Sequence, residues 1–368
     1  MSSKVYFSRR GAGNDGESTT DKIRRLFDAA GLGDCIHEGD LTAVKVHFGE
    51  KGNDTYINPV YVRQVVEKIR MFYGKPFVTD TNTLYNGSRH NTVDHLTTAA
   101  EHGFSPSVTG APVIISDGLR GDHFRMVRID GKHFIEVKIG GDIASADSMI
   151  VLSHVKGHCM AGFGGAVKNL GMGCAPIPGK ADQHRGMCPA VNQATCSACG
   201  KCMVACRQSA VSIKSVAEIE KEHCIGCGEC IAGCPTGSLG YDWKRDLVTF
   251  MEMLTEHAFG AIKGKEDRVG FMNFLLDITP DCDCVPWSDS PIVPDIGILA
   301  SRDPVAIDAA SVDLVNSQSG ISGTRILTNL NPGEDKFRGV WESTDGLIQV
   351  RYGQEIGLGS GSYELIEI

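Results

Sequence analysis

The sequence lacks the features that mark membrane, secreted and nucleic-acid-binding proteins. Its 368 residues contain no run of 18 apolar residues, and the first residues lack the apolar core of a secretory signal. No basic run stands out, and the formal net charge is −9. Neither nucleic acid nor a membrane is therefore expected as a partner. We expect a soluble cytoplasmic protein, and acidic proteins of this size are often homodimers.

Cysteine, by contrast, is plentiful: the chain has 14, and eight of them form two matched runs. The first cysteines of the two runs, Cys196 and Cys224, are 28 residues apart, and each run reads Cys-x2-Cys-x2-Cys-x3-Cys. This is the ligand spacing of proteins that hold two 4Fe–4S clusters. Zinc sites prefer two separate Cys-x2-Cys pairs, and disulfides are not expected in the cytoplasm.

The run geometry predicts that the fourth cysteine of each run serves the other cluster. Thiolates three residues apart in a tight loop can bind one cube, whereas the fourth cysteine opens a helix that points away. The predicted ligands of one cluster are Cys196, Cys199, Cys202 and Cys234, and those of the other are Cys206, Cys224, Cys227 and Cys230. In these motifs, residues 188–242 resemble the bacterial two-cluster ferredoxins.

Strand and helix signals alternate on both sides of this segment. Short apolar strands are predicted at 5–7, 43–48, 77–80, 113–116, 149–154, 270–277 and 296–300, and helices at 20–30, 60–73, 90–102, 247–262 and 305–315. This alternation predicts an α/β fold with a mostly parallel sheet core. The segments 347–352 and 363–366 give only mixed strand signals.

The alternating pattern breaks at about residue 186 and resumes at about residue 243. We therefore predict that residues 1–185 and 243–368 form the two parts of one α/β core, the second with the C-terminal tail. Residues 186–242 are the inserted two-cluster ferredoxin-like module. An insertion of this kind requires its two ends to lie close together.

Polar residues gather where the predicted strands end, which is the edge where open α/β sheets bind ligands. A glycine-rich loop at 162–165 then opens a helix whose N-terminus could hold an anion, although it matches no nucleotide motif. The predicted cofactor-binding residues are Lys45, His47, Asp80, Gly162, Gly164, Gly165 and Asn169. An exposed strand face and a capping turn are the ordinary alternatives for the first three.

Three basic residues continue the strand at 149–154. Alternate positions place His154, Lys156 and His158 on one face if the strand continues, and such a face needs an anion or a metal to compensate its charge. We predict catalytic roles for these three residues and for Lys168, which would bind an anionic group and supply protons.

Further polar residues could extend this site. Lys180 and His184 precede the cysteine runs and could fold back over the same mouth. Cys282 and Cys284, separated by one residue, are more often structural than metal-binding. If Cys174 approaches them, the three could form an additional metal or redox site.

Taken together, these motifs resemble one family of proteins. The motifs are His154-x-Lys156-x-His158, the glycine loop through Lys168-Asn169, the two cysteine runs, and the late stretch from Ile296-Gly297 to Asp303-Pro304-Val305-Ala306-Ile307-Asp308. They resemble a family of ferredoxin-fused iron–sulfur proteins that is classed as a domain of unknown function. The resemblance implies an α/β core with an inserted two-cluster module and implies no reaction.

The leading hypothesis is an oxidoreductase. It would take electrons from a ferredoxin or a reductase and pass them through two 4Fe–4S clusters to an anionic substrate or cofactor in the α/β pocket. The alternatives are a non-enzymatic electron-carrier subunit and a metallocofactor-assembly or scaffold protein whose clusters are structural.

Overall fold

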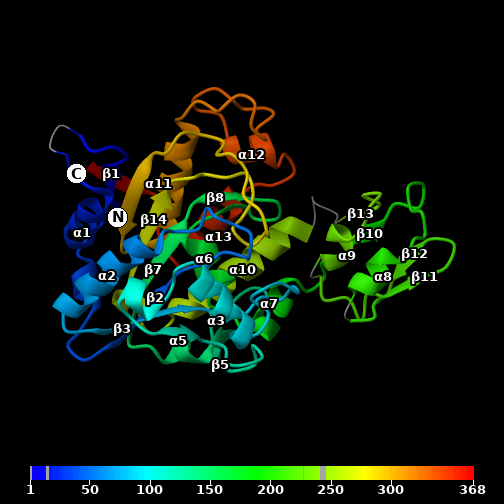
Figure 1. Cartoon of the computed structure of the whole chain (residues 1–368), viewed down its shortest axis with the longest axis horizontal. Coiled ribbons are helices and arrows are strands. Elements are labelled where there is room, and N and C mark those ends of the chain that lie inside the picture. The colour runs from blue at the N-terminus through cyan, green and yellow to red at the C-terminus, as the bar shows by residue number, and fades with distance from the viewer. Residues whose placement is uncertain (1, 14–15, 207, 227, 241–245) are drawn as a thin grey trace.

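The computed structural model in Figure 1 describes residues 2–13, 16–206, 208–226, 228–240 and 246–368. One predicted cluster ligand, Cys227, lies outside these residues. Among the helices within these ranges, none is long and apolar enough to span a bilayer.

An eight-stranded sheet forms the centre of the chain. Its strands lie in the order β16 (Tyr363–Glu367), β1 (Ser3–Arg9), β15 (Gly297–Ser301), β14 (Val269–Leu275), β7 (Ser148–His154), β2 (Leu41–Lys45), β3 (Lys75–Asp80) and β4 (Val113–Ile115). Strand β15 is antiparallel to both neighbours, whereas each pair from β14 to β4 is parallel. The predicted α/β fold with a mostly parallel sheet is confirmed.

The two faces of the sheet bury separate apolar clusters, because successive strand residues point to opposite sides. In β7, Met149 and Val151 join one cluster, and Ile150 and Leu152 join the other. The first face is covered by α6 (Ala166–Gly171), α10 (Asp246–Ile262), α11 (Pro304–Asn316) and α13 (Leu347–Glu355); the second is covered by α1 (Thr19–Ala29), α2 (Pro59–Met71) and α3 (Thr92–Glu101). Every residue of β7 is buried, as expected for a parallel strand that is covered on both faces.

Two long helices begin where the sequence places capping residues. Asn58 accepts a hydrogen bond from the amide of Val60, and Pro59 is the first residue of α2. Asp303 accepts hydrogen bonds from the first amides of α11, which begins at Pro304. Both caps satisfy amides that have no partner within the helix.

The C-terminal tail corrects one of the mixed strand signals. Residues 363–366 lie in β16, which pairs with β1, but residues 347–352 lie in the helix α13. The buried residues Gln349, Val350 and Gly353 have helical spacing and face α10 and α11. Packing against these two helices outweighs the local strand preference.

The cysteine-rich segment forms a small lobe beside the α/β core (Figure 1). This cysteine-rich lobe contains β10 (Ala190–Val191), α8 (Lys201–Ala205), β11 (Val211–Ile213), β12 (Ala217–Ile219), α9 (Glu229–Ala232) and β13 (Leu239–Gly240). Ala190 pairs with Gly240, and Val191 pairs with Leu239. The two ends of the lobe therefore lie side by side, as an inserted segment requires.

The remaining elements are short. The hairpin of β5 (Phe124–Arg128) and β6 (Glu136–Gly140) and the hairpin of β8 (Lys156–His158) and β9 (Gly162–Gly164) lie outside the main sheet. The short helices are α4 (Pro106–Thr109), α5 (Gly141–Ser145), α7 (Ile177–Gln183) and α12 (Lys336–Val340), with 3-10 turns at Leu32–Cys35 and Glu266–Arg268. The chain after β7 thus leaves the main sheet and turns into the β8–β9 hairpin.

Candidate functional site

A cavity of about 240 Å³ lies beyond the carboxyl ends of β2, β3 and β7, and we call it the basic pocket. Its volume is many times the space that one water molecule needs. Nine predicted site residues line it: His47, Asp80, His154, Lys156, His158, Gly164, Gly165, Lys168 and Asn169. The pocket is also lined by Lys180, His184, Cys282 and Cys284. Many of the residues that line it were therefore identified from the sequence.

Lys45 and Gly162 are exceptions, because they lie outside this lining. The buried ammonium of Lys45 lies 2.9 Å from an Asp80 oxygen and donates to Asn169 Oδ1 at 2.7 Å. Lys45 therefore neutralises Asp80 from behind the pocket and is not free to bind a cofactor. Gly162 has a φ of +73°, and an added Cβ would lie 2.6 Å from the backbone of Gly346, so packing explains this glycine.

His154 is engaged within the fold at both ring nitrogens. Nδ1 lies 2.8 Å from Asp283 Oδ1, and Nε2 lies 2.9 Å from the carbonyl oxygen of Leu276. No ring nitrogen of His154 is therefore left for a ligand. This placement does not favour the predicted catalytic role; His154 instead positions Asp283.

Asp283 supplies the counter-charge that the sequence led us to expect from a ligand. Besides His154, the ammonium of Lys156 lies 3.2 Å from an Asp283 oxygen. Burial alone would raise the pKa of Asp283, but His154 and Lys156 hold that pKa well below its ordinary value. Burial would likewise lower the pKa of Lys156, and Asp283 reverses that effect. The basic run is thus compensated mainly from inside the protein.

His158 and Lys168 stand next to the Cys282–Cys284 pair. One ring nitrogen of His158 and the two cysteine sulfurs lie within 4.8 Å of one another, and Lys168 Nζ lies 3.6 Å from Cys282 Sγ. A hydrogen bond from Cys284 lowers the pKa of Cys282 well below its ordinary value, and Lys168 adds to this effect while burial opposes it. The same bond and burial raise the pKa of Cys284. Cys174 is buried elsewhere and is not part of this group.

The N-terminus of α6 is already occupied. Asp308, on α11, accepts hydrogen bonds from the amides of Ala166 at 2.7 Å and Val167 at 2.9 Å. A Cβ on Gly165 would lie 2.3 Å from Asp308 Oδ1, which explains why this position is glycine. The glycine loop therefore receives a carboxylate of the protein where we expected an external anion.

Burial lowers the pKa values of two histidines and one lysine that line the pocket. Burial lowers the pKa of His158 well below its ordinary value and that of His184 to about 4. Burial also lowers the pKa of Lys180 to about 8, although Asp117 and Asp80 oppose it. Lys180 Nζ donates to Thr81 Oγ1 at 2.6 Å and lines the pocket. With this pKa, Lys180 can give up a proton near neutral pH.

The segment 83–90 contributes Thr83, Leu84, Tyr85 and Arg89 to the lining of the basic pocket, and the sequence did not indicate this role. Arg89 is buried between Glu50, at 3.2 Å, and Asp80, at 3.5 Å. The amide of Thr83 donates to the carbonyl of Arg89, which closes the segment into a loop. We call residues 83–90 the partition loop. In the sequence, Arg89 shortly before the helix cap Asn91 looks like part of an exposed turn, so nothing indicated that this arginine is buried.

The cysteines of the lobe line two cavities. Cys196, Cys199, Cys202 and Cys234 surround one of them, and Cys206, Cys224 and Cys230 line the other. Each cavity thus combines cysteines of both runs. The donor sets fit the crossed 4Fe–4S assignment, because each is built of sulfur ligands around one small space. The clusters themselves stay a prediction.

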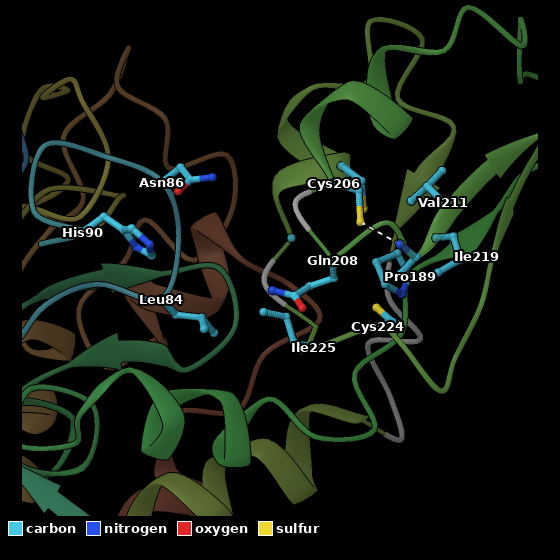
Figure 2. A pocket seen from close by; sticks show the side chains of 13 residues that line it. Leu84, Asn86, His90, Pro189, Cys206, Gln208, Val211, Ile219, Cys224 and Ile225 are labelled. Atoms are coloured by element: carbon cyan, nitrogen blue, oxygen red, sulfur yellow. Dashed lines mark hydrogen bonds between the residues drawn. The ribbon is translucent and has the colours of Figure 1, made fainter. Parts of the chain in front are cut away.

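The second of these cavities lies against the α/β core. Figure 2 shows Leu84, Asn86 and His90 on one side and Cys206, Cys224 and Ile225 on the other, and all six line the cavity. Leu84 lines the basic pocket too. His90 Nδ1 lies 2.8 Å from the carbonyl oxygen of Thr83, which lines the basic pocket. The partition loop therefore lies between the cysteine-lined cavity and the basic pocket and lines both of them.

A comparison with family models identifies the relatives of this chain. The model described as "Domain of unknown function (DUF362)" matches residues 42–313. The chain belongs to the DUF362 family. The DUF362 match runs from β2 to α11, so it includes the basic pocket, the partition loop and the cysteine-rich lobe. This confirms that the chain belongs to a family without an assigned function.

Two solved structures match this chain at low sequence identity. No curated protein matches this DUF362 chain. Among solved structures, the lactate racemase apoprotein from Thermoanaerobacterium thermosaccharolyticum matches with a TM-score of 0.37 and 12% identity, over 75% of this chain and 51% of that one. A protein from Thermotoga maritima matches with a TM-score of 0.32 and 10% identity, over 70% and 49%. The chain thus spans about half the length of these proteins.

Proposed function

We propose that this protein is an iron–sulfur oxidoreductase that delivers electrons to an anionic substrate or cofactor in the basic pocket. Cys196, Cys199, Cys202 and Cys234 would hold one 4Fe–4S cluster, and Cys206, Cys224, Cys227 and Cys230 the other. When bound, these clusters supply single electrons at low potential. The observation that carries the proposal is the partition loop, which lines both a cysteine-lined cavity and the basic pocket.

The pocket residues would bind the anion and supply protons. Lys168 points its ammonium at the Cys282 sulfur, and among the described residues it forms no ion pair with a carboxylate. Its charge therefore acts on the Cys282 sulfur and on any anion that binds next to it. Lys180, with a pKa of about 8, would give up the proton that must accompany reduction. His154 and Lys156 hold Asp283 and keep this side of the pocket in place.

The proposal is tested on protein purified without oxygen. Iron and acid-labile sulfide are expected at about eight each per chain, and the reduced protein should give the electron paramagnetic resonance signals of reduced cubanes. Fewer than about four irons would contradict the assignment. Clusters that resist reduction by dithionite would favour the structural role instead.

A pocket variant separates the pocket from the clusters. Lys168→Gln should keep the full iron content but lose the thermal stabilisation that inorganic phosphate or another small anion gives to the wild type. Lys263→Gln, at an exposed lysine directly after the C-terminus of α10, is the matched control and should keep it. Equal stabilisation of both variants would remove Lys168 from the site.

A further inference from the structure

We propose that Cys282 and Cys284 form a redox-active dithiol in the basic pocket, and that its substrate is an anionic disulfide. This inference deepens the proposed function and rests on it for the supply of electrons. It assigns a role to two cysteines that the cluster motifs leave unused. It also names the chemical class of the substrate.

The first argument is the geometry of the pair. The amide of Val285 donates to the carbonyl of Cys282 at 3.1 Å, so the chain turns tightly here and brings the two thiols to the same side. The two sulfurs lie within 4.8 Å of each other, and both line the pocket. Asp283, between them, is buried and anchored by His154 and Lys156. The two thiols are therefore held close enough to exchange a disulfide with little movement.

The second argument distinguishes a dithiol from a metal site. The amides of Met160 and Ala161 both donate to His158 Nδ1, each at 3.1 Å. A neutral imidazole that accepts at Nδ1 carries its proton on Nε2, so no lone pair remains for a metal. Histidines that bind metals show the reverse, since their second nitrogen donates a proton.

The surrounding charge points the same way. The Lys168 ammonium, 3.6 Å from Cys282 Sγ, stabilises a thiolate there and would repel a divalent cation at the same place. In a close pair of thiols, the one next to a lysine is the more readily ionised and therefore the one that attacks. Cys282 is therefore the nucleophile, and Cys284 is the resolving thiol.

The proposed reaction balances as follows. The Cys282 thiolate attacks one sulfur of the substrate disulfide, forms a mixed disulfide and releases one substrate thiolate. Cys284 then attacks the Cys282 sulfur and gives its proton to the second departing thiolate, which leaves a Cys282–Cys284 disulfide. Two electrons and one proton restore the starting thiolate and thiol. The first substrate thiolate takes a proton from solvent. In the net reaction, one substrate disulfide, two electrons and two protons give two substrate thiols.

The electrons come from an external one-electron donor of the ferredoxin class and enter through the cysteine-rich lobe. A two-electron disulfide couple requires two such transfers, which suits a lobe with two sets of sulfur ligands. The substrate is anionic because Lys168 and Lys180 line the same cavity as the dithiol. A cavity of about 240 Å³ admits a small disulfide or the exposed disulfide of a peptide.

The test follows the thiols themselves. The full chain, with its iron content measured, is incubated without oxygen with oxidised glutathione, after which free thiols are alkylated and the digest is analysed by mass spectrometry. The wild type should yield a Cys282–Cys284 disulfide. Cys284→Ser should instead accumulate a mixed disulfide between Cys282 and glutathione, and Cys282→Ser should form neither product.

The matched control is Cys159→Ser, since Cys159 lines the same pocket but lies outside the group of Cys282, Cys284 and His158. This variant should behave as the wild type does. Complete alkylation of Cys282 and Cys284 after incubation of the wild type would overturn the inference. Protection of both thiols by a bound metal ion, reversed by a chelator, would overturn it as well.

A second measurement separates this inference from the proposed function. Dithionite should restore the dithiol in iron-loaded protein much faster than in protein stripped of iron. A disulfide that forms but is restored equally slowly in both samples supports the dithiol and contradicts electron delivery through the lobe. Clusters that are present and reducible beside thiols that never oxidise support the proposed function and overturn the dithiol.

Discussion

The cysteine-rich lobe and the α/β core hold their cysteines in opposite settings. Among the described residues of the lobe, five buried ones form an apolar cluster, and two of them, Cys202 and Cys230, are predicted cluster ligands. In the core, Cys35 and Cys174 belong to apolar clusters several times larger. An apolar cluster this small supplies little folding free energy, and small domains of this kind usually add metal or disulfide links. The lobe should therefore depend on what its cysteines bind, and the core should not.

Removal of the metal should have the largest effect. Stripping iron from the protein is expected to unfold the lobe and to leave the core folded, because metal binding supplies folding energy in small metal-binding units. Hydrogen exchange measured by mass spectrometry should show lost amide protection in β11 and β12 and retained protection in β7 of the same sample. Retained protection in the lobe would show that its apolar cluster suffices to keep it folded without metal. The proposed difference between the lobe and the core would then be wrong.

Sequence reasoning reached the local features of both regions. Ligand spacing within a cysteine run and a cap such as Asn58 before Pro59 involve residues a few positions apart, so the sequence displays them directly. The alternation of strands and helices predicted the fold class in the same way. It could not predict the strand order, because β7 lies between β2 and β14, which are far apart in the sequence.

The partners of the pocket residues were beyond reach for the same reason. Asp283 is 129 residues from His154, and Asp308 is 142 residues from Ala166. The predicted ligand anion was therefore inferred at positions that two buried carboxylates of the protein already occupy. The site residues themselves could be found from the sequence, because parallel strands bring their carboxyl ends to one edge and the glycine loop follows the last of these strand ends.

In the core, the loss of one buried charge should lower the free energy of unfolding more than the loss of any cysteine. Asp283→Asn leaves His154 and Lys156 buried without their carboxylate, which should cost about 3–5 kcal/mol of unfolding free energy. Iron content should not change. Urea unfolding followed by far-UV circular dichroism measures the loss, and Asp289→Asn on the same segment is the control. That exposed carboxylate should contribute within about 0.5 kcal/mol, and an equal loss in both variants would contradict this role of Asp283.

The α6 cap should have a smaller and pH-dependent effect. Asp308 accepts three buried hydrogen bonds, from Ala166, Val167 and Asn273, and Asp308→Asn should cost about 1–3 kcal/mol at neutral pH because one donor loses its acceptor. Urea unfolding of both proteins at neutral pH measures this difference, again with unchanged iron content.

The pH dependence of that difference provides the sharper test. Burial raises the pKa of Asp308 from 3.8 to about 6 in the folded chain. The folded state therefore binds more protons than the unfolded state between these two values, so acidification in this window stabilises the wild type. From about pH 7 to about pH 5, the wild type should gain about 1 kcal/mol relative to Asp308→Asn, whose amide does not titrate. A constant difference over this range would mean that the hydrogen bonds of α6 keep Asp308 ionised. Asp308 would then cap α6 as a permanent negative charge held by hydrogen bonds alone, whereas the thiolates of the lobe are expected to need a metal.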